Sequence, residues 1–209
     1  MEDCFTTLRG NVRAEIKIQG SRFIATAAPV HDREAVDQLL GAVRKEFYDA
    51  THHCYAYRLG TAGDQSKASD GGEPSGSAGK PILSAIEHAG LTDVAVIVTR
   101  YFGGTKLGIG GLVRAYGETA GEALQRAERV THHIVERFRA SFPHTQVSNV
   151  MYVIGKLGAR ITGTAYDEEV HLTLEIRRSR SAEMREALVN RTNGKIRLHL
   201  DKREAEGPS

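Results

Sequence analysis

The sequence has no apolar run that approaches the roughly 20 residues needed for a membrane-spanning helix. Its N-terminus carries Glu2 and Asp3 where a secretory signal would be basic, and no apolar segment follows them. The two cysteines, Cys4 and Cys54, are too few for a disulfide framework and lack the close spacing of a zinc knuckle. We therefore expect a cytoplasmic protein with no membrane segment and with both cysteines as free thiols.

A strong excess of either charge is also lacking, since the formal net charge of the 209 residues is only +2. The basic residues are mildly in excess after Val130 and not before it. Dedicated nucleic-acid binders usually have a larger basic excess, so this charge permits an anionic partner without requiring one. The length fits one large domain or two small ones.

Hydrophobic periodicity in the first half predicts a mixture of strands and helices. The alternation in "AEIKIQG" and "RFIATAA" predicts a hairpin that turns near Gly20, and Asp32 is placed to cap the helix that follows. The other predicted elements are a helix over 32–47, a strand over 52–59, a Gly/Ser-rich loop over 60–80, a short helix over 81–90, a fully buried strand over 94–100 and a helix from Leu112 to Arg129.

From Thr131 a new series of elements begins. Its pattern predicts a strand over 132–138, a helix over 143–157, strands over 159–166 and 170–177, a helix over 181–191 and a strand over 195–200. This βαββαβ order is the ferredoxin-like arrangement, which forms a small self-sufficient domain. We therefore predict two domains, 1–130 and 131–209, with a frayed tail at the end.

The first segment whose residues suggest a binding or catalytic site is "TRYFGGTKLGIGGLVRAY", residues 99–116. It lacks the adjacent Gly-Lys-Ser/Thr of a P-loop, and it has Val113 where the dinucleotide-binding pattern needs Gly or Ala. Two interpretations remain. The backbone amides of Gly108 to Gly111, with Lys106 nearby, would hold a phosphate or carboxylate, or the glycines serve tight turns and close packing.

The second such segment is "SDGGEPSGSAGKP", residues 69–81. Asp70 and Glu73 would act there as a general base or as metal ligands, and Ser75 and Ser77 as nucleophiles or anion donors. The alternative is a solvated loop whose acids and hydroxyls cap its own turns. On a strand, His52 and Cys54 point to one face but would need distant residues to complete a metal site, so we predict no metal and no cofactor.

The strings "DGGEPSGSAGKPIL" and "VIVTRYFGGTKLGIGGLVRAYGE" closely resemble the signature of the YigZ/IMPACT family. The resemblance extends from Gly20 to about Arg126, and the later βαββαβ segment is similar to the extra domain of bacterial YigZ-type members. The usual family string is Asp-Gly-Glu-Pro, whereas this sequence has an additional glycine, Gly72. That glycine shifts Asp70 relative to Glu73.

The resemblance implies an α+β protein. Its N-terminal domain would have the fold of the second domain of ribosomal protein S5, and its C-terminal domain would be ferredoxin-like, similar to domains of elongation factor G. Eukaryotic members of the family restrain the amino-acid-starvation kinase by occupying the activator protein that the kinase needs. The resemblance thus implies a translation-related regulatory or binding protein.

We therefore predict that the protein binds the ribosome, RNA or a translation-associated protein through a Gly-rich cleft, which would also suit a phosphate or other anion. The predicted binding residues lie on the two Gly-rich segments: Ser75, Gly76, Gly79, Lys80, Arg100, Tyr101, Phe102, Gly103, Gly104, Lys106, Gly108, Gly110, Gly111 and Arg114. The alternative is a small-molecule hydrolase or phosphotransferase that uses Asp70, Glu73 and Ser75. On this basis a binding protein is favoured over an enzyme.

Overall fold

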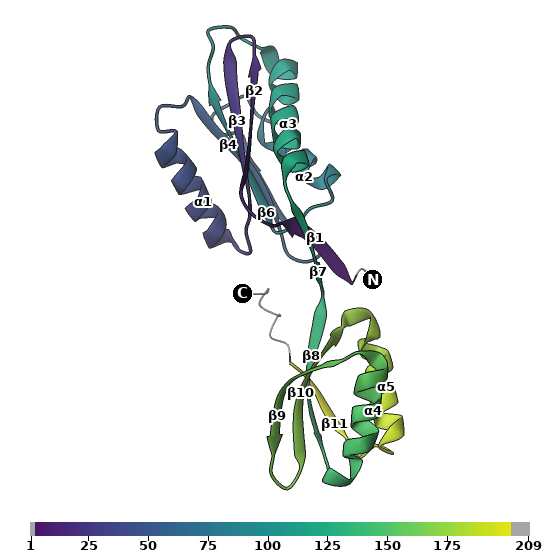
Figure 1. The fold of residues 1–209 in the computed structure, drawn as a ribbon. Coiled ribbons are helices and arrows are strands. Elements are labelled where there is room, and N and C mark those ends of the chain that lie inside the picture. The colour runs from purple at the N-terminus through teal and green to yellow at the C-terminus, as the bar shows by residue number, and fades with distance from the viewer. Residues whose placement is uncertain (1–2, 202–209) are drawn as a thin grey trace. The chain divides into compact units, whose positions relative to one another are not determined.

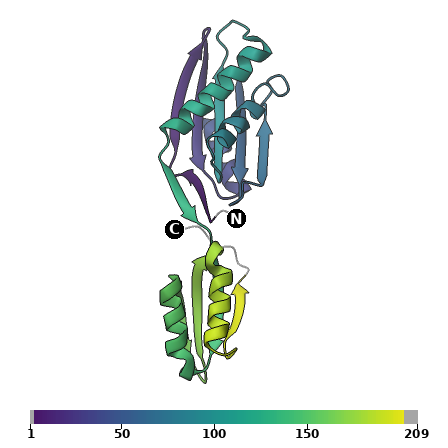
Figure 2. The same cartoon turned by 90° about the vertical axis from the view of Figure 1, so that its right-hand side faces the viewer.

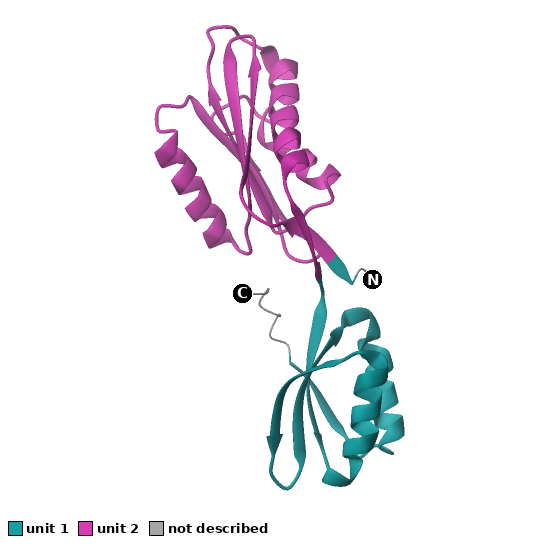
Figure 3. Cartoon of the chain, in the orientation of Figure 1, with its two compact units in different colours: residues 1–4, 133–209 teal, residues 5–132 magenta. Residues whose placement is uncertain are grey.

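The computed structural model describes residues 3–201 and divides the chain into two compact units. Residues 5–132 form the N-terminal unit, and residues 133–209 together with 1–4 form the C-terminal unit (Figure 3). The predicted tail lies mostly outside the described residues. Within the described part of the chain, no helix is both long and apolar enough to cross a membrane.

The N-terminal unit is built on a five-stranded antiparallel sheet with the strand order β2-β3-β6-β4-β5. Its strands and helices, together with a separate β1-β7 pair, are β1 (Cys4–Leu8), β2 (Val12–Ile18), β3 (Ser21–Pro29), α1 (Arg33–Glu46), β4 (His52–Leu59), β5 (Gln65–Ser69), α2 (Gly79–His88), β6 (Val94–Tyr101), α3 (Gly108–Arg126) and β7 (Arg129–His133).

Helices cover both faces of this sheet, with α2 and α3 on one face and α1 on the other (Figures 1 and 2). Alternate residues of β6 serve the two layers. Val96 and Val98 belong to the core under α2 and α3, whereas Ile97 packs with the buried residues of α1. The apolar run of this strand is therefore buried on both sides, as the sequence predicts.

Local sequence explains where the first elements begin and turn. The hairpin turn consists of Gln19 and Gly20, both with positive φ (45° and 81°), as a two-residue turn between right-twisted strands requires. The Asp32 side chain accepts a hydrogen bond from the Ala35 amide at 2.8 Å, which confirms the predicted helix cap.

The C-terminal unit contains a four-stranded antiparallel sheet with the strand order β11-β8-β10-β9. Its elements are β8 (Val135–Phe142), a short 3-10 helix (His144–Gln146), α4 (Val147–Leu157), β9 (Arg160–Tyr166), β10 (Val170–Arg177), α5 (Arg178–Arg191) and β11 (Arg197–Asp201). Their order is βαββαβ, as predicted. Buried residues of α4 and α5 pack on one face of the sheet, and Gly158 ends α4 in the left-handed conformation (φ 67°).

Three features of the N-terminal unit differ from the sequence prediction. The segment 60–80 is not a continuous loop, because it contains the polar edge strand β5. Helix α3 begins at Gly108 rather than Leu112 and ends at Arg126, and β7 follows it. Strand β1 was not predicted. The expected domain boundary, Val130, lies inside β7 and close to the division between the two units, which falls between residues 132 and 133.

Candidate functional site

The two Gly-rich segments meet at one end of the N-terminal sheet. The segment that follows β6 approaches the β2-β3 turn so closely that a Cβ atom on Gly103 would lie 1.9 Å from the carbonyl carbon of Gly20. No side chain can be accommodated at that distance. Gly103 therefore serves a close backbone approach, which is the packing interpretation of this glycine.

Asp70 is used to close the loop that precedes α2. One carboxylate oxygen accepts from the Gly76 amide at 2.8 Å, and the other accepts from the amides of Ala78 (3.0 Å) and Gly79 (2.8 Å). Burial opposes ionisation of the carboxyl, but these three amides outweigh it and hold the pKa of Asp70 below its ordinary value. Asp70 thus caps the N-terminus of α2 and holds the preceding loop against it.

Glu73 is buried and holds three elements together. Its Oε1 accepts hydrogen bonds from Arg100 Nη1 of β6 and from the Tyr116 hydroxyl of α3, each at 2.7 Å. The side chains of Glu73 and Arg100 are only 3% and 6% exposed. Burial raises the pKa of Tyr116, so its hydroxyl stays protonated and donates to the carboxylate.

Arg100 is enclosed by aromatic rings. Its guanidinium carbon lies 5.4 Å from the Phe23 ring centroid and 5.5 Å from that of Phe102. Nη2 reaches Ser21 Oγ at 3.4 Å, whereas Nε is the one buried side-chain nitrogen or oxygen in the described chain without a hydrogen-bond partner. The sequence placed this cation on the binding surface, but its charge is turned inward and neutralised by Glu73.

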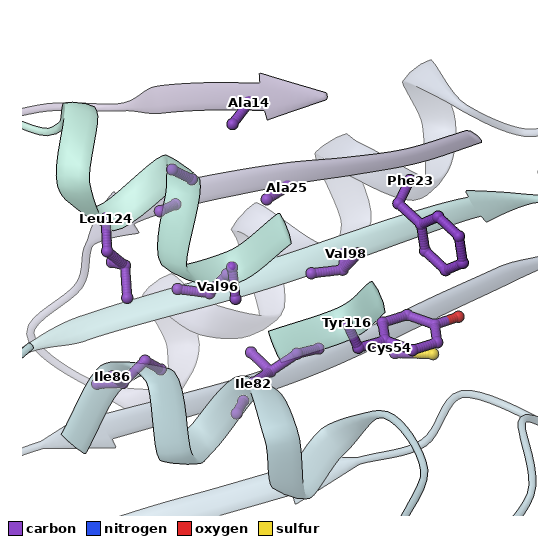
Figure 4. Close-up of a cluster of buried hydrophobic side chains, with 14 of the residues drawn as sticks. Ala14, Phe23, Ala25, Cys54, Ile82, Ile86, Val96, Val98, Tyr116 and Leu124 are labelled. Carbon is purple, nitrogen blue, oxygen red and sulfur yellow. The ribbon is translucent and has the colours of Figure 1, made fainter. Parts of the chain in front are cut away.

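Cys54 lies beside this cluster, with its thiol close to the Tyr116 ring (Figure 4). The thiol donates to the Asp70 carbonyl at 2.9 Å, and burial raises its pKa to about 12. A thiol that stays protonated is a poor nucleophile and a poor metal ligand. Cys54 and Cys4 are both free, as predicted. In the described part of the chain, no group of three or more His, Cys, Asp or Glu residues is arranged to hold a metal.

The hydroxyl and imidazole groups of the loop are not arranged as a catalytic pair. Ser75 is exposed, and Ser77 is buried and donates to the Pro74 carbonyl at 2.6 Å. His52 Nδ1 lies 3.0 Å from the Gly71 carbonyl, and its Nε2 is 4.0 Å from Glu73 Oε1. The hydrogen bonds of the described residues thus link His52 to the loop backbone and not to a serine.

The remaining predicted glycines differ in their roles. Gly76, Gly104 and Gly108 have positive φ (76°, 87° and 69°), and Gly79 packs so closely on β5 that a Cβ would be 2.6 Å from the Ser69 amide nitrogen. Gly108, Gly110 and Gly111 form the first turn of α3. One interpretation of the sequence assigns Gly110 to a tight turn or to close packing, but this residue is helical and a Cβ there would meet nothing closer than Arg114 Nη1 at 3.8 Å.

Apart from the hydroxyls of Ser75 and Thr105, the exposed side chains around these glycines are apolar or basic, and we call the set named below the glycine-rich face. Tyr101 is half-buried at its margin, with its hydroxyl donating to Asp49 at 2.8 Å. The face consists of Ser75, Lys80, Phe102, Lys106, Ile109, Val113 and Arg114. Its predicted members therefore remain available for binding, and Ile109 and Val113 are additions that the sequence alone did not single out.

Tyr116 and Ser21 are further residues that sequence reasoning did not assign to the site. Tyr116 reads as one more apolar position on the core-facing side of a helix, and Ser21 as a turn residue. Only the approach of α3 and β3 to Glu73 and Arg100 gives them polar roles.

Comparison with known proteins identifies the family. The model of the Impact N-terminal domain matches residues 19–124, which is about half of the chain, and a domain of unknown function, DUF1949, matches residues 141–195. The protein belongs to the IMPACT family. The YvyE member of the family from Bacillus subtilis is 33% identical over 87% of this chain and 83% of its own. The YigZ member from Escherichia coli is 32% identical over 87% and 90%.

A solved structure extends the similarity to the whole fold. The crystal structure of a hypothetical protein superposes with a TM-score of 0.69 and 29% identity, covering 98% of this chain and all of that one. This IMPACT family member thus matches a solved protein over almost its whole length and the two bacterial relatives over most of theirs.

Proposed function

We propose that this IMPACT family member is a translation-related regulatory protein that recognises a ribosome-associated protein through its glycine-rich face. The observation that carries the proposal is that the acidic side chains of the loop and the basic side chains of the glycine-rich face point opposite ways at this end of the sheet. The acids are turned inward, where they hold the loop and the helices. The outward-facing groups are glycine backbone, apolar side chains, hydroxyls and cations, with no exposed carboxylate or imidazole among the residues of the face to exchange a proton with Ser75, and such groups suit recognition.

A hydrolase or phosphotransferase would need Asp70 or Glu73 to exchange a proton with a substrate or to hold a metal. Both carboxylates are already engaged by protein donors, and losing those bonds would release α2 or leave Arg100 unpaired. These costs favour binding over catalysis at this site.

The link to translation rests on the family. The family resemblance implies that eukaryotic members act on the starvation response and that both units have folds that translation-related proteins also use. We infer that the C-terminal unit is ferredoxin-like, because its βαββαβ order and its strand order β11-β8-β10-β9 are those of that arrangement. We infer similarly that the N-terminal unit resembles the second domain of ribosomal protein S5, and that the protein acts in the cytoplasm.

Ribosome co-sedimentation tests the proposal. Lys106→Glu replaces attraction by repulsion on the glycine-rich face, so we expect it to reduce co-sedimentation while the melting temperature stays nearly unchanged. Lys45→Glu, an exposed lysine on α1 at the other face of the sheet, is the matched control. If Lys106→Glu binds ribosomes as well as the control does, the function lies elsewhere.

Salt dependence distinguishes the kind of partner. Contacts with RNA phosphates release counterions, so binding to RNA should weaken steeply between low and physiological salt. A protein partner held largely by apolar contacts should be much less sensitive. Steep salt dependence that persists with protein-free ribosomal RNA would replace the proposed protein partner by RNA.

We further propose that the two units fold separately. The buried core of the C-terminal unit is formed entirely by residues between Phe138 and Ile196, and the N-terminal unit has its own cores. Fragments 1–132 and 133–209 should therefore each show a cooperative thermal transition. A fragment 133–209 without such a transition would contradict this expectation.

A further inference from the structure

The outward side of α3 carries an apolar stripe that its neighbour covers only in part. Ile109, Val113 and Gly117 follow one another at intervals of one helical turn, so they lie on the same side of α3. Gly117 packs against α2, because a Cβ at this position would be 3.7 Å from Pro81 Cβ. The two turns before it are less covered, since Ile109 is 64% exposed and Val113 38% exposed.

Exposed large aliphatic side chains are few in the described part of this unit. Two of them, Ile109 and Val113, lie one turn apart on α3. Phe102, 48% exposed, belongs to the segment that leads into the same helix. A single exposed apolar residue would need no explanation, but an aligned pair on one helix is typical of a surface that a second helix covers.

Positive charges flank the stripe. Lys80, Lys106 and Arg114 are exposed, and none of them has an ion-pair partner within 4 Å among residues 3–201. In the loop before α2, Glu73 is paired with Arg100, whereas Asp70 keeps its negative charge, which backbone amides and Lys80 stabilise. On α3, Glu118 is an exposed acid one turn beyond Arg114, so the three cations exceed the two unpaired carboxylates of Asp70 and Glu118. The rim of the stripe is therefore basic overall.

We propose that the stripe formed by Ile109 and Val113 is the docking site for an acidic amphipathic helix of a protein partner. The partner would present apolar side chains at intervals of three and four residues to the stripe and carboxylates to Lys80, Lys106 and Arg114. This inference rests on the proposed function and names the chemistry of its partner. Unlike the Phe102 ring beside them, the branched side chains of Ile109 and Val113 offer no flat surface on which bases stack, so the stripe itself favours a protein helix over single-stranded nucleic acid.

The first measurement uses a defined probe. We would titrate the full-length protein, labelled with ¹⁵N, with a synthetic 18-residue helix that has leucine at helical spacing and glutamate at its other positions. Its twin carries lysine in place of glutamate. The acidic peptide should shift the amide signals of residues 102–118 and bind more tightly than the basic twin by about tenfold or more. Equal binding of the twins, or shifts confined to other residues, would overturn the proposal.

The second measurement tests the stripe itself. The double variant Ile109→Ser/Val113→Ser removes partly exposed aliphatic groups and should fold normally. It should nevertheless bind the acidic peptide about tenfold or more weakly than the unaltered protein does. Tyr48→Ser, which truncates an 84% exposed ring elsewhere on the unit, is the control and should bind as the unaltered protein does. Unchanged peptide binding by the double variant would overturn the docking site, as would tighter binding of an oligouridylate to the same residues.

Ribosome co-sedimentation of the same variants keeps the two proposals distinguishable. Suppose that Lys106→Glu reduces ribosome binding, while the peptide does not bind the stripe and the double variant binds ribosomes normally. The docking inference then fails and the proposed function stands. If the peptide docks on the stripe and no ribosome binding occurs, the docking site stands and the proposed function fails.

Discussion

Replacing Glu73 by glutamine is the most direct test of how the Gly-rich loop is held. The substitution keeps the shape of the side chain but removes the counter-charge of Arg100, whose side chain is only 6% exposed. No other carboxylate forms an ion pair with Arg100 among residues 3–201, its Nε already has no partner, and Ser21 is a weak substitute at 3.4 Å. The structure thus predicts a poorly compensated buried charge.

Breaking one side of a buried ion pair typically costs about 3–5 kcal/mol, and the lack of alternatives for Arg100 argues for the upper part of that range. With a urea m-value of roughly 2 kcal/mol/M, the unfolding midpoint of the N-terminal unit should fall by about 2 M. The expected loss is a large share of a typical domain stability of about 5–15 kcal/mol.

The assay is urea unfolding followed by circular dichroism, with Glu87→Gln as the control, since Glu87 is exposed on α2 and should change stability by no more than about 0.5 kcal/mol. Tyr116→Phe removes the second donor to the same carboxylate oxygen and should lower the free energy of unfolding by about 1.5–3 kcal/mol. A Glu73→Gln protein whose free energy of unfolding lies within about 1 kcal/mol of that of the unaltered protein would refute the structural role of the pair. Glu73 would then again be a catalytic candidate.

Further predictions concern glycine packing, acid stability and thiol reactivity. Gly103→Ala should lower the free energy of unfolding by about 3 kcal/mol or more in the same urea assay, because its Cβ would meet backbone atoms. Gly110→Ala, in the open first turn of α3, should raise it by about 0.5–1 kcal/mol. The pKa of Asp70 is lowered in the folded state, so its contribution to stability is present at neutral pH and is lost as pH falls below about 4; Asp70→Asn should flatten this part of an acid-unfolding curve. Exposed Cys4 should react with iodoacetamide at pH 8 in the native protein while Cys54, with its pKa raised to about 12, should not, and two labelled thiols per native chain by mass spectrometry would contradict the buried position of Cys54.

Much of the secondary structure could be predicted from local sequence because the responsible signals are local. The alternation before and after Gly20, the Asp32 cap and the apolar run of β6 each specify one element without help from the rest of the chain. The βαββαβ order of the second half could be predicted for the same reason. The exceptions were β1, β5 and β7, short strands whose formation depends on the strand that they pair with.

The role of each polar residue at the site depended on tertiary structure. The sequence by itself determined that two Gly-rich segments with acids, cations and hydroxyls stand in one domain, and that both resemble the signature of one family. It could not separate the inward from the outward groups, because Asp70, Glu73 and Arg100 are as polar as Lys80 or Lys106. Only the packing of β6, α3 and the loop buries Arg100 against Glu73, and a buried charge must find its partner there, whereas an exposed one is free to meet another molecule.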